Sequence, residues 1–441
     1  MNFKNWWFFR NTTKKKKSQK NTYTSLEKIF TPVNDLVIGM YIVELDKPWL
    51  ETAFMFQGFE LKTEAELQSV KDTCEYVYID MTKNKKEQGP IIEHIDSSPH
   101  NKAIFDYGAP PQIISVFEKQ ISNAEKVYVS SGALVIDFMD KIAKGGGIDV
   151  KLAKQAVAEC VNSVLHSPDA ILWLTQLKKK DEYTSQHSLN VCVLSIVLGR
   201  HINLSEVHLN VVGLCGMMHD MGKMLVPLEI LNKPGTLDDE EKLIMQSHTS
   251  LGYELLKSSD EMHPCAIDVA HSHHERLDGN GYPRKIKQTY LTQYTRIVAI
   301  ADVYDAMTSD RVYQKGRTHL EAINIMSNLA NHHLDEALVI KFIESIGVYP
   351  PGCLVQMTNG AIAIVVEVNE KMKLRPKIII ILDEERNPVP EAVINLSAMG
   401  TDKCGAVYTI KGIVRAEDWH IDASKYYQEG VLQKGFAMSK S

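Results

Sequence analysis

The residues of this chain that are best suited to metal chemistry are histidines and aspartates in its central part. Nine of the 16 histidines fall between positions 187 and 274, and five of these, with two aspartates, lie in segments about one helix and turn apart. These candidates are His187, His219, Asp220, His248, His273, His274 and Asp302. Neutral imidazole nitrogens and carboxylate oxygens that converge from several helices are suitable ligands for Fe, Mn, Ni or Zn. The pattern therefore predicts a metal centre inside a helical bundle.

The local sequence around both aspartates favours this interpretation. Asp220 follows His219 in an otherwise apolar stretch, and Asp302 is the single acid of another apolar run. An unpaired carboxylate in such a setting is costly, and coordination to cations removes the penalty. On a helix Lys223 would project near the same face as Asp220, where it could hold a phosphate oxygen beside the metals. The alternative is a set of core histidines, each bonded to a backbone carbonyl, with Asp302 as a packing acid. Four histidines outside the pattern are interpreted as ordinary helix or loop residues: His263, His271, His332 and His333.

The elements that position these side chains are predicted to be mainly helices. From about residue 112 to 346, apolar residues recur at intervals of three and four, which indicates a bundle of seven to nine helices. Ahead of it, residues 31–79 contain short strand-like runs and one helix over 63–72, which begins with the capping-box residues Thr63 and Glu66. A polar, proline-containing stretch over 82–110 is interpreted as a linker.

After residue 352 the apolar period changes to that of strands. Asn359-Gly360 lies between two apolar runs and predicts a hairpin, and residues 377–382 predict another strand. The expected fold class is mainly α, a helical bundle with a small α+β N-terminal domain and a small β C-terminal module. The predicted domains are a tail (1–23), an accessory domain with its linker (24–110), a helical connector (111–150), the bundle (151–348) and the β-module (349–418).

The composition excludes several classes of protein. The 441 residues are 44% hydrophobic and 24% charged, with a net charge of −6, which does not fit a disordered chain or a strongly basic binder of nucleic acid polymers. No apolar run approaches the roughly 18 residues of a membrane-spanning helix. The seven cysteines are scattered and form no C-x-x-C pair, which is typical of free thiols in a reducing cytoplasm.

The first 20 residues are an exception to the acidic balance. They carry seven lysines and arginines, no acid, and the aromatic run Trp6, Trp7, Phe8 and Phe9. Their order and length do not fit a signal peptide, which is basic first and then apolar over a longer stretch. Two interpretations remain: a solvated tail, or a weak contact with an anionic membrane surface through inserted aromatics and lysines on headgroups.

The histidine pattern resembles the HD superfamily of metal-dependent phosphohydrolases, through His219-Asp220 with His187 upstream and Asp302 downstream. The run HHERLDGNGYP at 273–283 resembles the HD-GYP branch of that superfamily. Further motifs of this kind are found at 230–235, 301–307 and 311–313. The resemblance covers roughly residues 150–348. The N-terminal segment, which includes the motifs at 39–41 and 45–50, resembles an accessory domain of unknown function that often precedes HD-GYP domains.

This resemblance implies an HD-type bundle that opens cyclic di-GMP to the linear dinucleotide pGpG, with further cleavage to GMP left open. It implies that the seven candidates hold two divalent metals, with Asp220 as the bridging ligand. Lys223 and Arg311 would contact the substrate phosphates, and Tyr282 would lie beside the substrate. In the implied mechanism a hydroxide between the metals attacks phosphorus, while the metals and Lys223 compensate the charge on the phosphate oxygens. Fe or Mn is expected, with Ni and Zn as alternatives.

The family's three-metal members carry a glutamate four residues before the first histidine. Tyr183 occupies that position here and Glu182 is one residue out of register, so two metals are expected. The resemblance also implies that the loop Gly281-Tyr282-Pro283 lies beside the active site or docks partners such as diguanylate cyclases. The sequence leaves open whether the chain dimerises through the helices near 112–165. Two other functions remain: a phosphodiesterase for another nucleotide, such as the mixed cyclic GMP–AMP dinucleotide, and a non-catalytic receptor for a cyclic dinucleotide.

Overall fold

The computed structural model describes most of the helical part of the chain and pieces of its two ends. The described residues are 28–33, 36–45, 59–74, 76–80, 117–176, 183–310, 315–330, 332–369, 372–390, 393–398, 409–419 and 421. The predicted N-terminal tail, the linker at 82–110, Glu182 and Arg311 lie outside them. The chain forms two compact units, residues 1–87 and 88–441, which are described separately.

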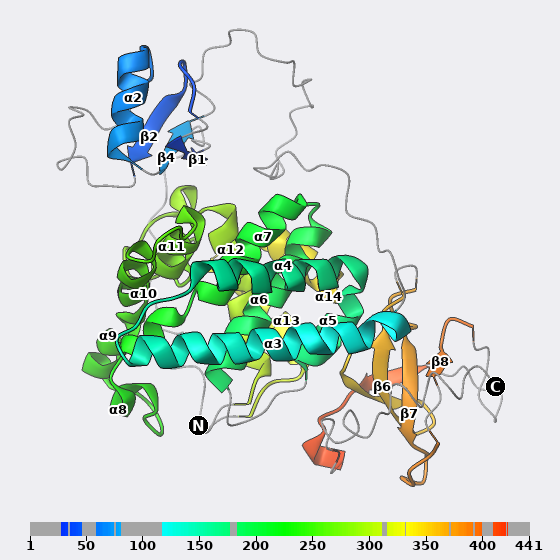
Figure 1. Cartoon of the computed structure of the whole chain (residues 1–441). Helices are drawn as coiled ribbons and strands as arrows, with labels where there is room; N and C mark the ends of the chain where they lie inside the picture. The colour runs from blue at the N-terminus through cyan, green and yellow to red at the C-terminus, as the bar shows by residue number, and fades with distance from the viewer. Residues whose placement is uncertain are drawn as a thin grey trace, which may run out of the picture. The chain divides into compact units, whose positions relative to one another are not determined.

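The first unit is a small antiparallel sheet with one helix (Figure 1). Its strands are β1 (Lys28–Pro32), β2 (Tyr41–Leu45), β3 (Phe59–Glu60) and β4 (Tyr76–Asp80), in the order β1-β4-β2-β3. The helix α2 (Glu64–Thr73) begins at the predicted capping box, in which the Thr63 hydroxyl accepts from the Glu66 backbone and the Glu66 carboxylate accepts from the Thr63 backbone. Leu67 and Val70 of this helix pack with Ile42 and Ile79 of the strands into one apolar core. This confirms the predicted small α+β domain.

The second unit contains twelve helices among its described residues, more than the seven to nine predicted. They are α3 (Phe117–Ala143), α4 (Val150–His166), α5 (Pro168–Thr175), α6 (Tyr183–His201), α7 (Glu206–Met218), α8 (Leu228–Leu231), α9 (Asp239–Gln246), α10 (His248–Lys257), α11 (Pro264–Ser272), α12 (Gln293–Thr308), α13 (His319–Leu329) and α14 (Glu336–Ile346). The predicted count was wrong because breaks between helices can be very short. Only Ser167 separates α4 from α5, where Pro168 starts the new helix, and only Ser247 separates α9 from α10.

Helices α6 and α12 form the centre of this unit. They contact each other, and both contact α7, while the long helix α3 packs against α4, α5 and α6 (Figure 1). Thirteen of the sixteen residues of α12 are buried, so this helix has no polar face toward solvent. A helix that is buried all round belongs to the core, and polar side chains on it need partners inside the protein. Asp302 and Asp305 are two such side chains on α12. Among the described helices, none combines the length and the apolar character needed to cross a membrane.

The chain continues into a five-stranded antiparallel sheet. Its strands are β5 (Leu354–Met357), β6 (Ile362–Glu367), β7 (Lys377–Leu382), β8 (Val393–Asn395) and β9 (Ile410–Ile413), in the order β8-β7-β6-β5-β9. The predicted hairpin is confirmed, since β5 pairs with β6 through a turn that ends at Gly360 with a φ of +100°. Glycine suits this left-handed conformation. The backbone N–H of Val368 donates to the Asp169 carboxylate (2.9 Å), which attaches the sheet to the start of α5.

The buried ring of His319 links α12 to the end of α14 and makes stability depend on pH. Its Nε2–H donates to the carbonyl of Gly347 (3.0 Å), and in the neutral ring its Nδ1 accepts from the Tyr304 hydroxyl (2.9 Å). Burial lowers the pKa of His319 from 6.5 to about 4. Because the unfolded chain takes up this proton at higher pH, the contribution of His319 is complete above pH 6.5 and is lost as the pH falls toward 4.

We therefore expect the Tm of the chain to fall between pH 6.5 and 4 less steeply in His319→Gln than in the wild type. The glutamine amide can donate to Gly347 and accept from Tyr304 but does not titrate. Thermal unfolding of both proteins across this range checks the expectation, because the other histidines are common to both. Parallel pH profiles would contradict it.

Candidate metal centre

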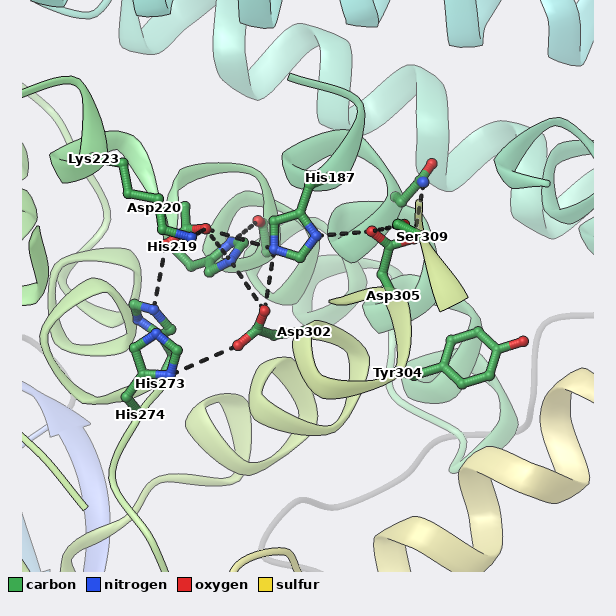
Figure 2. Close-up of polar contacts among 12 residues, drawn as sticks. His187, His219, Asp220, Lys223, His273, His274, Asp302, Tyr304, Asp305 and Ser309 are labelled. Atoms are coloured by element: carbon green, nitrogen blue, oxygen red, sulfur yellow. Dashed lines mark hydrogen bonds and ion pairs between the residues drawn. The ribbon is translucent and has the colours of Figure 1, made fainter. Parts of the chain in front are cut away.

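All seven candidate ligands lie at one place in the second unit, and most of them stand at helix ends. His187 is on α6 and Asp302 on α12, whereas His219 and Asp220 form the turn between α7 and the 3-10 helix η4 (Met221–Leu225). His248 is the first residue of α10, and His273 and His274 follow the last residue of α11. His187, His219, Asp220, His248, His273 and Asp302 are buried, and only His274 is partly exposed. In Figure 2 the side chains of His187, Asp220, Asp302 and His274 point toward one another.

Two glycines allow the backbones around this site to approach closely. A Cβ on Gly222 would lie 2.0 Å from the carbonyl oxygen of His248 and 2.4 Å from the backbone nitrogen of Gly252, so η4 can touch α10 only with glycine at 222. A Cβ on Gly281 would lie 2.4 Å from the Cα of Glu275. The loop that contains Gly281 therefore lies directly against the chain that follows His274.

The carboxylate of Asp220 lies between two groups of imidazoles. Its Oδ2 is 3.5 Å from His187 Nε2 and 3.3 Å from His219 Nε2. Its Oδ1 is 3.4 Å from His248 Nε2 and 3.6 Å from His273 Nε2. The seven residues accordingly form two groups whose ligand atoms lie within 4.8 Å of one another: His187, His219 and Asp302, and Asp220, His248, His273 and His274. The arrangement can serve two cations that share one carboxylate.

Asp302 also contacts residues of both groups. Its Oδ1 lies 3.1 Å from His187 Nε2 and 3.9 Å from His219 Nε2, and its Oδ2 lies 3.9 Å from His274 Nδ1 (Figure 2). Two buried carboxylates, Asp220 and Asp302, therefore face five imidazoles. Both aspartates lie in apolar stretches of the sequence, and this setting is the signal from which they were predicted to be metal ligands.

Hydrogen bonds on the outer side of three rings fix which nitrogen faces the centre. His219 donates from Nδ1 to the carbonyl of Gly216 (2.7 Å), and His248 donates from Nδ1 to the carbonyl of Met245 (2.7 Å). His273 donates from Nδ1 to carbonyls of its own helix at 3.1 Å. Each Nε2 thus carries a lone pair that points inward, as expected of imidazoles that bind a metal.

His187 is held by a carboxylate that the sequence analysis did not select. Its Nδ1–H donates to Asp305 Oδ2 at 2.8 Å, and Asp305 also accepts from the hydroxyl of Ser309 (3.2 Å). A signal for Asp305 was present, because it follows Asp302 by three residues on the same helix and therefore lies on the same face. A carboxylate behind a histidine orients the ring and raises its basicity as a ligand.

The charges of the site are set by burial and by these neighbours. Burial lowers the pKa of His248 to about 3 and also lowers the pKa values of His219 and His274, so these rings are neutral at pH 7. Burial alone would raise the pKa of Asp220, but Lys223 and His219 hold it well below its usual range. Asp302 and Asp305 overcome the effect of burial on His187 and raise its pKa to about 9. The site therefore presents negative charge and three neutral imidazoles to a cation, and His187 would give up the proton on Nε2 to bind one.

Two buried polar atoms test whether a metal would fit here. His219 Nε2 and Asp220 Oδ1 are both buried and make no hydrogen bond within the described part of the chain. A buried acceptor without a hydrogen-bond partner destabilises the folded protein. One of the two atoms, His219 Nε2, belongs to the first group of candidate ligands, and the other, Asp220 Oδ1, belongs to the second. A divalent cation in each group would supply the missing partners. The donor set, with imidazole nitrogen and carboxylate oxygen, fits divalent transition metals.

Of the three residues predicted to contact the substrate, Lys223 and Tyr282 lie beside the candidate metal ligands. The ammonium of Lys223 forms an ion pair with Asp220 Oδ2, with 23% of its side chain exposed, so it stands at the open edge of the centre. The ring of Tyr282 lies over the ring of His274, with centroids 4.7 Å apart and an interplanar angle of 31°. Arg311 lies outside the described residues, and of Tyr183 only the backbone at the start of α6 is described.

The loop around Tyr282 is tied down by a second acid that the sequence analysis did not single out. The buried carboxylate of Glu275 accepts from the backbone N–H groups of Arg284 (2.7 Å) and Ile286 (3.2 Å). Tyr282 itself donates its backbone N–H to the carbonyl of His274 (3.2 Å). These bonds and the close contact at Gly281 hold the Tyr282 ring beside the centre.

The histidines taken as ordinary residues lie outside both groups. His263 precedes α11 and accepts from the backbone of Cys265 (3.2 Å), and the ring of His271 packs against Tyr253. The backbone carbonyls of His332 and His333 accept from the 277–278 segment. Within the described chain, none of them belongs to a cluster that could hold a metal.

Comparison with known families assigns three segments of the chain. Residues 174–338 match an HD domain, residues 28–153 match a domain of unknown function (DUF3391), and residues 354–401 match a KOW domain associated with HD domains. The DUF3391 match continues through α3, a helix for which the sequence predicts a separate connector. The HD match contains all seven candidate ligands.

Three relatives show what the chain is similar to. A cyclic di-GMP phosphodiesterase of Pseudomonas aeruginosa is 34% identical over 88% of this chain and 92% of its own length. A 3'3'-cGAMP-specific phosphodiesterase of Vibrio cholerae is 38% identical over 36% of each chain. A cyclic di-GMP phosphodiesterase of Thermotoga maritima is 34% identical over 37% of this chain and 45% of its own length. Only the first similarity extends over all three matched segments.

Proposed function

Because the chain belongs to the family of HD-domain proteins that carry DUF3391, we propose that it is a metal-dependent phosphodiesterase that hydrolyses cyclic di-GMP to linear pGpG. The observation that carries this proposal is the carboxylate of Asp220, whose two oxygens face two separate groups of imidazoles. The relative that supports the choice of substrate is the Pseudomonas aeruginosa enzyme, which matches this chain over nearly its whole length.

The proposed cofactor is a pair of divalent cations. His187, His219 and Asp302 would hold one, and His248, His273 and His274 the other, with Asp220 shared between them. Fe or Mn suits this mixture of imidazole and carboxylate, and Ni and Zn are the alternatives. We keep two cations rather than three, because the position that would supply an additional glutamate is Tyr183.

The chain's own residues bind and orient the substrate in this proposal. When bound, the two cations supply a nucleophile from water near neutral pH and offset negative charge on the phosphodiester. Lys223, at the open edge of the centre, turns its ammonium from Asp220 to a phosphate oxygen, where a fixed positive charge stabilises the transition state. Tyr282 offers an aromatic ring beside His274 for a guanine base. Arg311 is proposed as a second phosphate contact on the motif alone.

A second substrate is favoured by one comparison. The 3'3'-cGAMP-specific phosphodiesterase of Vibrio cholerae is 38% identical over 36% of this chain. Both substrates have two phosphodiesters and at least one guanine, so the metal centre would treat them alike and the base pocket would decide. A non-catalytic receptor remains a third proposal. The presence of all seven candidate metal ligands argues against it.

Incubation of the metal-loaded full chain with cyclic di-GMP, 3'3'-cGAMP and cyclic di-AMP, followed by chromatography of the products, tests the proposal. We expect cyclic di-GMP to be opened to pGpG, with a kcat/KM at least about tenfold above that for either other dinucleotide, a difference of about 1.4 kcal/mol in transition-state binding. Preferred cleavage of 3'3'-cGAMP would select the second substrate. Binding of the dinucleotides without any product would select the receptor.

The remaining proposals concern location and partners. The six described cysteines are all free, and five are buried, which supports a reducing compartment such as the cytoplasm. Docking of diguanylate cyclases at the Gly281-Tyr282-Pro283 loop, a homodimer, and membrane contact through the N-terminal tail stay proposals from the sequence.

A further inference from the structure

We propose that Tyr128, on α3, is a positioning residue for the metal ligand His187 and acts through Asn190 and Asp305. This inference rests on the proposed metal centre. It gives a role to a helix outside the HD match, because α3 lies within the segment that matches DUF3391. It also concerns only one of the two ligand groups, which makes it testable separately from the function of the whole site.

Three consecutive hydrogen bonds connect Tyr128 to His187. The Tyr128 hydroxyl donates to Asn190 Oδ1 at 2.7 Å. Asn190 Nδ2 donates to Asp305 Oδ1 at 3.0 Å, and Asp305 Oδ2 accepts from His187 Nδ1 at 2.8 Å. Asn190, Asp305 and His187 are each 1–3% exposed, so water does not compete for these bonds. The path joins α3, α6 and α12 and ends on the ring whose Nε2 faces Asp220 and Asp302.

The chemistry of the groups allows only one direction for these bonds. A carboxylate only accepts, so Asp305 requires the NH₂ side of the Asn190 amide, and the amide oxygen must then face Tyr128. Reversing the amide would place its oxygen against the Asp305 carboxylate. The Tyr128 hydroxyl, together with the Thr175 carbonyl that accepts from Asn190 Nδ2 (3.5 Å), therefore holds the amide in the orientation that Asp305 needs. Asp305 in turn keeps the proton of His187 on Nδ1, leaving Nε2 for the metal.

The variant that tests this role is Tyr128→Phe, which removes one hydroxyl and keeps the ring. The probe is Mn²⁺ alone, titrated into the full metal-free chain in competition with a chelator, to give two dissociation constants. His187→Ala identifies which constant belongs to the group of His187, His219 and Asp302. Loss of a partner behind a metal ligand typically weakens metal binding by about 10–100-fold, and we expect about tenfold for the same constant in Tyr128→Phe.

Tyr294→Phe is the matched control. Its hydroxyl also makes a 2.7 Å bond to a side chain of the same unit, His208, but His208 is in neither ligand group. We expect both Mn²⁺ constants of this variant to match the wild type. Asn190→Asp is the second test: it places a carboxylate against Asp305 and should weaken the same constant by more than Tyr128→Phe. Circular dichroism of the metal-free proteins verifies that each variant is folded.

Selective weakening of the His187 constant in Tyr128→Phe, with the other constant unchanged, is the result that supports the proposal. Unchanged constants, or equal weakening of both together with a lower Tm, would overturn it, since the hydroxyl would then be irrelevant or merely structural. Failure here is distinguishable from failure of the proposed function. A wild-type chain that binds two Mn²⁺ ions and opens cyclic di-GMP retains that function whatever the result for Tyr128→Phe.

Discussion

Asp220→Ala will abolish both the hydrolysis of cyclic di-GMP and the tight binding of metal. Each oxygen of this carboxylate faces a different group of imidazoles, so its removal would take a ligand from both proposed cations at once. Loss of a single electrostatic stabiliser of a transition state costs about 10²–10³ in rate, and we therefore expect kcat to fall by about a thousandfold or more. The measurement is product formation by chromatography, together with metal content per chain after gel filtration.

Asp239→Ala is the control for this variant. Asp239 is an exposed acid at the start of α9 that pairs with Lys242 on the surface. Its removal changes the net charge in the same way without touching the centre, and we expect activity and metal content to match the wild type. Full hydrolysis in Asp220→Ala would sink the two-metal account of this site.

Gly222→Ala will lower the stability of the second unit and weaken its metal binding. The added methyl group would meet backbone atoms of His248 and Gly252, which cannot rotate away as a side chain could, so η4 must separate from α10. Overpacking typically costs 1–3 kcal/mol, and for backbone atoms this close we expect about 3 kcal/mol, or roughly 6–12 °C in Tm. Because Asp220 directly precedes η4 and Lys223 lies on it, metal binding by the group of Asp220, His248, His273 and His274 should weaken as well.

Gly132→Ala provides the comparison for Gly222→Ala. A Cβ at Gly132, inside α3, would meet only a methyl group of Leu189 at an ordinary 3.8 Å. Alanine is favoured over glycine within a helix by roughly 0.5–1 kcal/mol, so this variant should be as stable as the wild type or more so. Differential scanning calorimetry of both variants, with a metal titration of each folded protein, makes the comparison. Equal Tm values for the two would show that the contact at 222 is not tight.

Most of the fold could be predicted from the sequence because its signals are local. The capping box at Thr63, the hairpin ending at Gly360 and the strand at 377–382 each depend on a few neighbouring residues. The number of helices was predicted less accurately. A single residue such as Ser167 or Ser247 can separate two helices, and apolar periodicity continues across so short a break.

The candidate ligands could be predicted from the sequence because their segments are unusual: aspartates and histidines occur there within apolar stretches that are predicted to be helical. The structure brings these seven side chains together, and their role as ligands stays a proposal. Asp305 had a signal in its spacing from Asp302 that was not used. Tyr128 and Asn190 had none, since a tyrosine on one helix and an asparagine on another 62 residues away are joined only by tertiary packing.

In the proposed metal centre one carboxylate, Asp220, joins two cation sites at the end of α7. Anomalous diffraction from crystals of the Mn²⁺-loaded full chain, measured on either side of the manganese absorption edge, locates these sites. We expect two manganese peaks, one within coordination distance of each oxygen of Asp220, with His219 beside the first and His248 beside the second. A single peak, or two peaks that do not share Asp220, would contradict it.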